Sequence, residues 1–247
     1  MIDESVNGES VACTGSFPSG GIAVVFGANG GIGRALALRL AAQPDFSIVL
    51  GYSRSSAVAL DLCEESSIEA VAADVSRCGV DVRLLIDATG VLDGDGCVAE
   101  KSWRQLDPAA MTRAFAVNAI GPALLMKHFL PLLPRAGRCV FATLSARVGS
   151  IGDNRLGGWY SYRSSKAALN QIVRTAAIEL RRLSPEALCV AMHPGTVATP
   201  LSARFAKPGL EVQSPDTAAI RILTVLNMLT PPSSGDFFDQ RGRPITW

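Results

Sequence analysis

The sequence has 247 residues, of which 48% are apolar and 18% charged, and its formal net charge is +1. This length can bury one α/β core, and the balanced charge gives no reason to expect nucleic acid or an anionic membrane as partner. The six cysteines form no CxxC pair and there are only two histidines. A disulfide framework, a metal site and a Ser-His-Asp triad are therefore not expected, and a reducing cytoplasmic location is.

The first twenty residues are polar and rich in glycine and serine, without a basic start followed by an apolar core. We interpret residues 1–20 as a flexible tail rather than a secretory signal, and residues 21–247 as one domain. The longest apolar stretch, residues 119–133, is interrupted by glycine, prolines, lysine and histidine. A transmembrane helix needs roughly 20 mostly apolar residues, so none is predicted.

Short apolar runs alternate along the chain with longer helical patterns. The runs predict strands over residues 22–26, 47–52, 70–73, 84–86, 138–144, 188–192 and 236–238. The longer patterns predict helices over residues 32–42, 56–63, 107–133, 158–183 and 214–229. Continuous apolar strands that alternate with helices indicate a parallel sheet covered on both faces. We therefore predict a doubly wound sheet in three α/β/α layers.

A glycine-rich turn joins the first predicted strand to the first predicted helix, with the spacing Gly-x-x-x-Gly-x-Gly. Glycine permits a tight turn and a close approach of backbone to ligand, and a helix N-terminus favours a pyrophosphate. A glycine turn alone is as consistent with plain chain reversal, but its place in a doubly wound fold favours a dinucleotide. The candidate residues are Gly27, Asn29, Gly30, Gly31, Ile32 and Gly33.

Tyr162 and Lys166 lie four residues apart in a predicted helix, so their side chains share one helical face. An adjacent ammonium favours a phenolate and would lower the phenol pKa from its ordinary value of about 10. A tyrosine tuned in this way can exchange a proton near neutral pH. Taken alone, the pair is more often an incidental feature of a solvated helix.

The glycine turn and the Tyr162–Lys166 pair together resemble the short-chain dehydrogenase/reductase family in its single-domain, Rossmann-type form. The resemblance implies that Asn118 is an active-site asparagine and that the acidic Asp74, with Val75, binds adenine. It also assigns cofactor contacts to the loop after the fourth strand and to a loop near residue 195. These contacts are Ala88, Thr89, Gly90, Pro194, Gly195, Val197 and Thr199.

Three further stretches resemble the C-factor-like and sniffer-like carbonyl reductases within that family. They are residues 144–150, the insertion 153–159 before the tyrosine, and residues 234–238.

The resemblance also implies a mechanism. A hydride passes between a nicotinamide and a carbonyl or alcohol carbon, while Tyr162 exchanges a proton with the oxygen. Lys166 lowers the phenol pKa and binds the nicotinamide ribose, and Asn118 holds a water that links Lys166 to solvent. Ser145 donates a hydrogen bond to the substrate oxygen.

Two positions depart from the family pattern. The family's Asn-Asn-Ala-Gly is replaced by Asp87-Ala-Thr-Gly90, which removes an asparagine that stabilises the sheet. The family's catalytic serine aligns with Ala146, one position after Ser145. A shift of one residue turns a side chain to the opposite face of a strand end. Ser145 remains the candidate, ahead of Ser150.

The residues after the second predicted strand bear on cofactor choice. An acidic residue there selects NAD, whereas an arginine suits the 2′-phosphate of NADP. Ser53 and Arg54 follow this strand, and no carboxylate occurs before Asp61. Because a guanidinium binds phosphate through paired hydrogen bonds, NADP is favoured over NAD. The alternative is that Arg54 is a solvated loop residue.

The substrate pocket is expected to be apolar. Its predicted lining suits an uncharged carbonyl compound, although each residue could serve packing alone: Val91, Leu92, Trp159, Leu201 and Phe205. The family resemblance implies a homodimer or homotetramer. A second hypothesis is a dinucleotide-binding protein that acts in signalling, motivated by the two departures. A hydrolase is not expected, because no Gly-x-Ser-x-Gly elbow is present.

Overall fold

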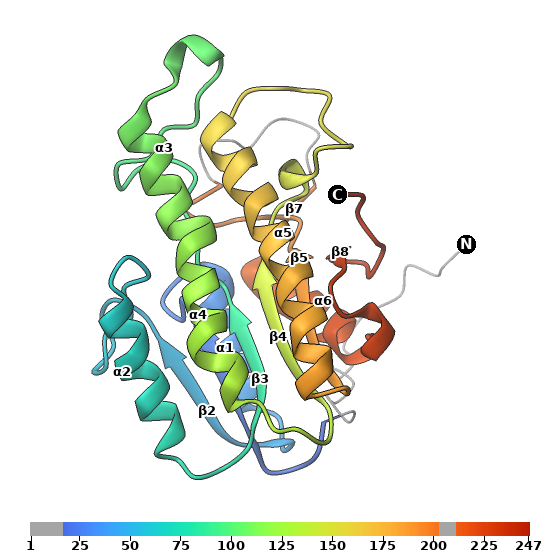
Figure 1. Cartoon of the computed structure of the whole chain (residues 1–247). Helices are drawn as coiled ribbons and strands as arrows, with labels where there is room; N and C mark the ends of the chain where they lie inside the picture. The colour runs from blue at the N-terminus through green and yellow to red at the C-terminus, as the bar shows by residue number, and fades with distance from the viewer. Residues whose placement is uncertain (1–16, 203–210) are drawn as a thin grey trace.

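The computed structural model describes residues 17–202 and 211–247. Its centre is a parallel sheet in the order β2-β1-β3-β4-β5-β8 (Figure 1). The strands of this sheet are β1 (Gly21–Phe26), β2 (Phe46–Tyr52), β3 (Val82–Asp87), β4 (Cys139–Leu144), β5 (Ala187–His193) and β8 (Phe237–Asp239). A separate pair joins β6 (Thr196–Val197) to β7 (Val212–Gln213). The strand order reverses between β1 and β3, which is where such folds place their ligands.

Helices cover both faces of the sheet, as predicted (Figure 1). One face carries α2 (Glu65–Ser76), α4 (Gly121–Phe129) and α5 (Tyr160–Leu183), and the other carries α1 (Gly31–Ala41) and α6 (Pro215–Met228). The short helix α3 (Pro108–Phe115) precedes α4. The predicted three-layer α/β/α architecture is therefore confirmed.

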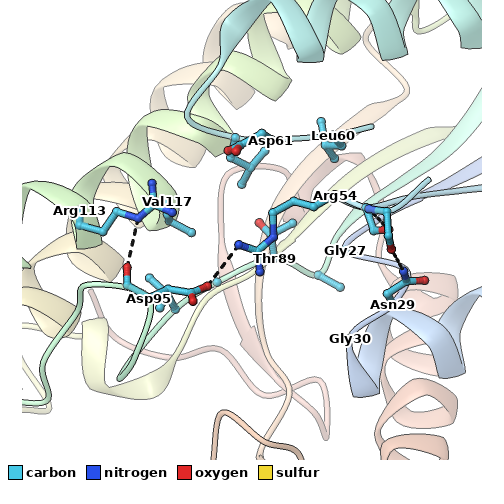
Figure 2. Close-up of a pocket in the computed structure, with 16 residues that line it drawn as sticks. Gly27, Asn29, Gly30, Arg54, Leu60, Asp61, Thr89, Asp95, Arg113 and Val117 are labelled. Atoms are coloured by element: carbon cyan, nitrogen blue, oxygen red, sulfur yellow. Dashed lines mark hydrogen bonds and ion pairs between the residues drawn. The ribbon is translucent and has the colours of Figure 1, made fainter. Parts of the chain in front are cut away.

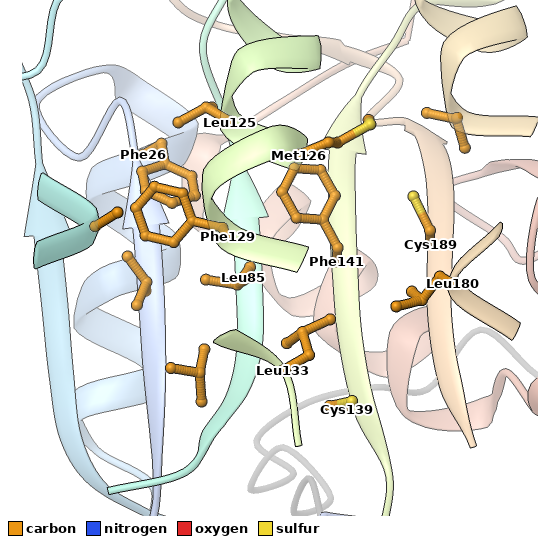
Figure 3. Close-up of a cluster of buried hydrophobic side chains, with 14 of the residues drawn as sticks. Phe26, Leu85, Leu125, Met126, Phe129, Leu133, Cys139, Phe141, Leu180 and Cys189 are labelled. Atoms are coloured by element: carbon orange, nitrogen blue, oxygen red, sulfur yellow. The ribbon is translucent and has the colours of Figure 1, made fainter. Parts of the chain in front are cut away.

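The sheet separates two apolar cores because each strand alternates its side chains between faces. Val24 and Phe26 point to the side of α2, α4 and α5, whereas Ala23 and Val25 point to the side of α1 and α6. Figure 3 shows the first of these cores, where the Phe26 and Phe129 rings meet edge to face at 4.7 Å. Burial on both faces explains why the strands are continuous apolar runs.

The predicted strand over residues 70–73 is wrong, since these residues lie inside α2. The buried residues of α2 are Ile68, Val71, Ala72 and Val75, whose spacing of three, one and three is helical. The apolar run at residues 70–73 fits a short strand, but Ile68 and Val75 on either side of it complete one face of a helix. The predicted helix over residues 56–63 is also wrong: that segment has no regular structure.

The predicted boundary of the tail is also wrong in part. Phe17 is buried, its ring lies 5.5 Å from that of Phe46, and the Arg138 guanidinium lies 5.2 Å from the Phe17 ring. The Gly20 amide donates to the Asp45 carbonyl. The packed domain therefore begins at least four residues before β1, and the rest of the predicted tail lies outside the described residues.

The predicted helix over residues 107–133 is interrupted at one point. A π-helical turn over Ala116–Ile120 separates α3 from α4. By length and composition the run Pro108–Leu132 could cross a membrane, since an 18-residue window within it has a mean hydropathy of 1.3. This differs from the sequence prediction, which considered residues 119–133 alone. In the fold, 44% of that window is buried, because α4 packs against α2 and α5. This packing accounts for its apolar residues without a membrane.

Candidate functional site

The glycine turn has the geometry expected of a phosphate-binding loop. Gly27 has φ +80°, in the left-handed region that favours glycine, and Gly30 caps the N-terminus of α1 without a side-chain bond. A Cβ on Gly33 would overlap the carbonyl oxygen of Gly27, so only glycine lets α1 start this close to β1. Ile32 and Gly31 stand at the helix start itself, and Thr199 packs over Gly31.

A cavity of about 420 Å³ opens at the carboxyl ends of β1, β2 and β3, beside this turn (Figure 2). Eight of the predicted cofactor residues line it: Gly27, Asn29, Gly30, Ser53, Arg54, Ala88, Thr89 and Gly90. Their convergence from three separate segments is the strongest structural support for the dinucleotide site. Asn29 donates to the Ser55 hydroxyl and so ties the glycine turn to the end of β2.

Arg54 stands at the mouth of this cavity with most of its side chain in solvent. Its Nη1 lies 3.3 Å from Oδ2 of Asp95, which comes from the loop after β3 (Figure 2). A second guanidinium, Arg113 of α3, also lines the cavity and donates to the backbone carbonyl of Asp95 at 3.3 Å. The mouth of the cavity therefore holds two cations, Arg54 and Arg113, on either side of Asp95.

The predicted adenine contacts of Asp74 and Val75 are wrong, because both residues lie in α2 rather than at a strand end. Asp74 accepts a hydrogen bond of 2.7 Å from Tyr52, and this bond and Arg77 lower the pKa of Asp74. Val75 is buried in the core. Both residues hold α2 against the sheet and do not line the cavity.

Asp61 lines the cavity in place of Asp74. It follows the irregular segment after β2, and its Oδ1 accepts from the Cys63 amide at 2.9 Å. Leu60 and Leu62 flank it in the cavity wall. An acidic residue between two leucines, just before a helical pattern, was the sequence signal for this position. The predicted strand over residues 70–73 led to Asp74, rather than Asp61, as the candidate adenine contact.

Asp87 replaces the family's asparagine at the end of β3 and is almost fully buried. Its carboxylate accepts from the Thr143 hydroxyl at 2.7 Å and from the Thr89 hydroxyl and amide at 2.5 and 3.0 Å. Asp87 thus links β3 to β4 and fixes the loop through Gly90. The substituted residue keeps the stabilising role with different partners.

Asn118 lies in the π-helical turn, fully buried. Its side chain accepts from the Val91 amide at 2.9 Å and donates to the Val91 carbonyl at 2.8 Å. A third bond of 3.2 Å reaches the Ser165 hydroxyl. π-helical turns occur often at functional sites. Here the turn lets one side chain join α5 to the loop after β3, a role that the sequence did not reveal.

Tyr162 and Lys166 lie on α5 as predicted, and burial governs both. Lys166 is fully buried and its Nζ donates to the Leu144 carbonyl at 2.7 Å, 3.6 Å from where a Cβ on Gly90 would stand. Burial lowers the pKa of Lys166 to about 8, partly opposed by Asp87. Burial raises the pKa of the Tyr162 phenol to about 12. The predicted lowering of the phenol pKa is not found in the protein chain itself.

A buried carboxylate fixes the start of α5. Glu100 accepts from the Ser161 hydroxyl and from the Ser161 amide, at 3.3 Å for the amide. A negative charge is favourable at a helix N-terminus. The preceding residue, Trp159, has φ +53° and its ring meets that of Tyr162 edge to face at 6.3 Å. Glu100 therefore sets the position of the turn that carries Tyr162, and the sequence held no signal for it.

Ser145 is buried beyond the end of β4, and its hydroxyl donates to Oδ1 of Asn170 at 2.7 Å. The hydroxyl proton of Ser145 therefore already takes part in a hydrogen bond within the protein. Ala146, in the register of the family's serine, carries no hydroxyl. Ser150 is buried as well and accepts from the Asp153 amide at 3.1 Å.

The loop after β5 returns beside the glycine turn. Gly195 has φ +78°, and Gln213 donates to the Pro194 carbonyl, which fastens β7 to this loop. Val197 is buried within β6, and Thr199 packs on Gly31 at the start of α1. Thr199 therefore brings this loop to the start of α1, beside the glycine turn.

The predicted substrate lining is only partly supported. Val91 lines the cavity and Trp159 contacts Tyr162, but Leu92 is a buried packing residue. Leu201 is exposed, and Phe205 lies outside the described residues. Two more cavity residues were not predicted from the sequence: Arg113 and Val117.

One cluster of potential metal ligands occurs among the described residues, although none was predicted. Glu65, Glu69 and His128 bring ligand atoms within 4.8 Å of one another on the outside of α2 and α4. Lys127 Nζ lies 2.5 Å from Glu65 and already supplies a cation there.

Comparison with known proteins identifies the family. The family model "short chain dehydrogenase" matches residues 21–208. The C-signal protein of Myxococcus xanthus is 36% identical over 171 residues, which cover 69% of this chain and 95% of that protein.

Two solved structures share the fold. An NADPH-bound carbonyl reductase from chicken fatty liver has a TM-score of 0.80 at 26% identity and covers 94% of this chain and 96% of its own. Carbonyl reductase Sniffer of D. melanogaster has a TM-score of 0.78 at 23% identity and covers 93% of this chain and 100% of its own. The resemblances noted in the sequence are confirmed, and the chain belongs to the short-chain dehydrogenase/reductase family of NAD(P)-dependent oxidoreductases.

Proposed function

We propose that this protein is an NADP-dependent reductase that interconverts a carbonyl compound and its alcohol, with Tyr162 as the acid–base group. The observation that carries this proposal is the arrangement on α5. Tyr162 is half-buried and Lys166 is buried on the same helical face, and Nζ of Lys166 lies near Gly90, which lines the cavity. A pure binding protein has no need of a shielded phenol and ammonium at this place.

The residues present fit a dinucleotide. The cavity extends from the glycine turn past Arg54 and along the loop after β3, and Gly27, Gly30 and Gly90 line it without side chains. NADPH, when bound, supplies the hydride. Asn29 and Gly30 would hold its pyrophosphate, Arg54 with Ser53 its 2′-phosphate, and Asp61 its adenine.

The protonation states of Tyr162 and Lys166 at neutral pH suit carbonyl reduction. With a pKa of about 12, the phenol of Tyr162 is protonated at neutral pH and can donate its proton to a carbonyl oxygen. With a pKa of about 8, Lys166 is also mostly protonated there. Carbonyl reduction should therefore be level below pH 8 and should fall as Lys166 loses its proton above it. Alcohol oxidation needs the phenolate and should rise with pH.

The substrate we propose is an uncharged carbonyl compound, since Val91 and Trp159 present apolar surface near the cavity and Tyr162. We infer NADP rather than NAD from Arg54, and one similar solved protein is a carbonyl reductase with bound NADPH. The test is oxidation of NADPH against a panel of aldehydes, ketones and quinones, with Tyr162→Phe as the control. A wild-type rate that survives in the variant would contradict the assignment of Tyr162.

A second candidate function is signalling through a partner, with dinucleotide binding but little turnover. Two observations favour it: the 36% identical relative is called C-signal, and the hydroxyl of Ser145 is committed to Asn170. NADPH binding without turnover on any carbonyl in the panel would support this candidate over the first.

We also propose a cytoplasmic homodimer or homotetramer, in which α4 and α5 pair with a second copy. These helices line an outward groove of about 480 Å³ with apolar residues, among them Met126, Leu130, Ile172 and Leu183. Leu183→Glu should lower the mass measured by light scattering from a dimer or tetramer toward a monomer. A wild-type protein that is already monomeric would contradict this proposal.

A further inference from the structure

A tight turn carries Asp95 across the mouth of the cavity. Gly94, Asp95 and Gly96 all have positive φ, at +88°, +51° and +82°. Gly94 and Cys97 close the turn with two backbone hydrogen bonds of 2.9 and 3.0 Å. Aspartate and asparagine tolerate the left-handed conformation better than other side chains do. Asp95 can therefore hold this left-handed position between two glycines and present its carboxylate there.

Two cations from opposite sides of the cavity hold this turn (Figure 2). Arg54, after β2, pairs with the Asp95 carboxylate at 3.3 Å, and Arg113 of α3 donates to the Asp95 carbonyl at 3.3 Å. Arg113 also donates to the Cys63 sulfur at 2.9 Å. Arg113 thus has a second anchor, whereas Asp95 provides the charge that faces Arg54.

The pair between Arg54 and Asp95 is suited to exchange. The two side chains are 69% and 59% exposed, and ion pairs this exposed contribute little to the stability of a protein. A phosphate offers the guanidinium paired hydrogen bonds and more charge than a single carboxylate does. A 2′-phosphate at Arg54 would therefore replace Asp95, while a 2′-hydroxyl would leave the pair in place.

We propose that Asp95 reduces the preference for NADPH over NADH by competing with the 2′-phosphate for Arg54. This inference rests on the proposed binding of NADP at Arg54 and adds a residue that lowers the selectivity. The 2′-phosphate of NADPH must displace the Asp95 carboxylate from Arg54 and is then repelled by its negative charge. NADH has no 2′-phosphate and is subject to neither effect. The preference for NADPH in the wild type is accordingly smaller than Arg54 alone would confer.

The test compares dissociation constants of NADPH and NADH, measured by fluorescence at low ionic strength, where exposed charges are least screened. Asp95→Asn removes the charge and keeps a residue that accepts the left-handed turn. It should tighten NADPH about two- to five-fold, the equivalent of one exposed ion pair, and leave NADH unchanged. Asp93→Asn is the matched control, because Asp93 is in the same loop but does not line the cavity.

A double-mutant cycle separates competition from a structural effect. Arg54→Ala should weaken NADPH binding, and Asp95→Asn added to Arg54→Ala should then tighten it much less than in the wild type. If Asp95→Asn tightens NADPH binding equally with and without Arg54, competition for Arg54 is wrong, because the Asp95 charge would then act on the phosphate directly. Weaker NADH binding in Asp95→Asn would also overturn it, and would make Asp95 the acceptor of the ribose 2′-hydroxyl.

The failures can be told apart. If wild-type NADPH binding is lost in Arg54→Ala but Asp95→Asn changes nothing, the role of Asp95 is wrong and the proposed cofactor stands. If the wild type binds neither dinucleotide, or Arg54→Ala has no effect on NADPH, the proposed NADP site and this inference are both wrong.

Discussion

The two ends of the candidate site differ in how they hold their charges. At the adenosine end, Arg54 and Asp95 are exposed and loosely paired at the mouth of the cavity. At the catalytic end, Lys166, Asp87 and Asn118 are buried, and their hydrogen bonds span α5, β3 and β4. Exposed charges can exchange partners at small cost, whereas buried ones fix geometry and shift proton affinity. Selectivity is thus expected at one end and chemistry at the other.

The largest effect that would sharpen this contrast is expected from Tyr162→Phe. Loss of the proton donor should lower the turnover of carbonyl reduction by about 10²- to 10⁴-fold. The dissociation constant of NADPH should stay within a few-fold, because the phenyl ring keeps the contact with Trp159. Steady-state rates and fluorescence titration measure the two quantities. Parallel losses of both would show that the two ends are not separable.

A second test uses stability and the half-buried histidine at the end of β5, His193. Burial, together with Arg147, lowers the pKa of His193 from 6.5 to about 4, although Asp239 opposes this, and its Nδ1 has no hydrogen-bond partner. The unfolded chain then binds a proton between pH 6.5 and pH 4 that the folded chain does not, so stability falls as the pH falls through this window. The loss is about 3 kcal/mol.

His193→Gln should remove most of that dependence, as measured by urea unfolding at pH 7 and pH 4.5. The free energy of unfolding should therefore fall less between pH 7 and pH 4.5 in the variant than in the wild type. Identical slopes would mean that His193 is not shielded from water in the folded protein.

The next effect concerns the acidic residue in the cavity wall. Asp61→Asn should weaken NADPH binding about three- to ten-fold, the equivalent of one hydrogen bond to adenine. Asp74→Asn is its matched control and should leave binding unchanged while lowering stability by about 1 kcal/mol through the lost Tyr52 contact. Weaker NADPH binding in the Asp74 variant alone would restore the prediction made from the sequence.

The smallest effect is expected from Ser145→Ala. Because its hydroxyl is bonded to Asn170, turnover should change by less than about three-fold, while stability falls by about 1 kcal/mol. Turnover is measured with NADPH at saturation and stability by urea unfolding. A loss above about a hundred-fold would match removal of an oxyanion donor, and would place Ser145 at the substrate oxygen as its sequence position suggested.

Local signals allowed much of the fold to be predicted. The glycine turn, the alternation of apolar runs with helices, and the Tyr162–Lys166 spacing depend on neighbours along the chain, and these features are found in the structure. The strand predicted at residues 70–73 failed because a four-residue window cannot distinguish a buried strand from one face of a helix. The same error moved the acidic residue from Asp61 to Asp74.

The sequence by itself determined the family, the three layers and the residues that can bind phosphate or exchange a proton, because motif spacing encodes them. Only the tertiary structure decided which atoms meet. It joined Asn118 to Val91, Ser145 to Asn170, Glu100 to the start of α5, and Asp95 to Arg54. It also raised the Tyr162 pKa and lowered that of Lys166. The physical reason is that burial and contact between distant segments are properties of the packed chain, and no local pattern records them.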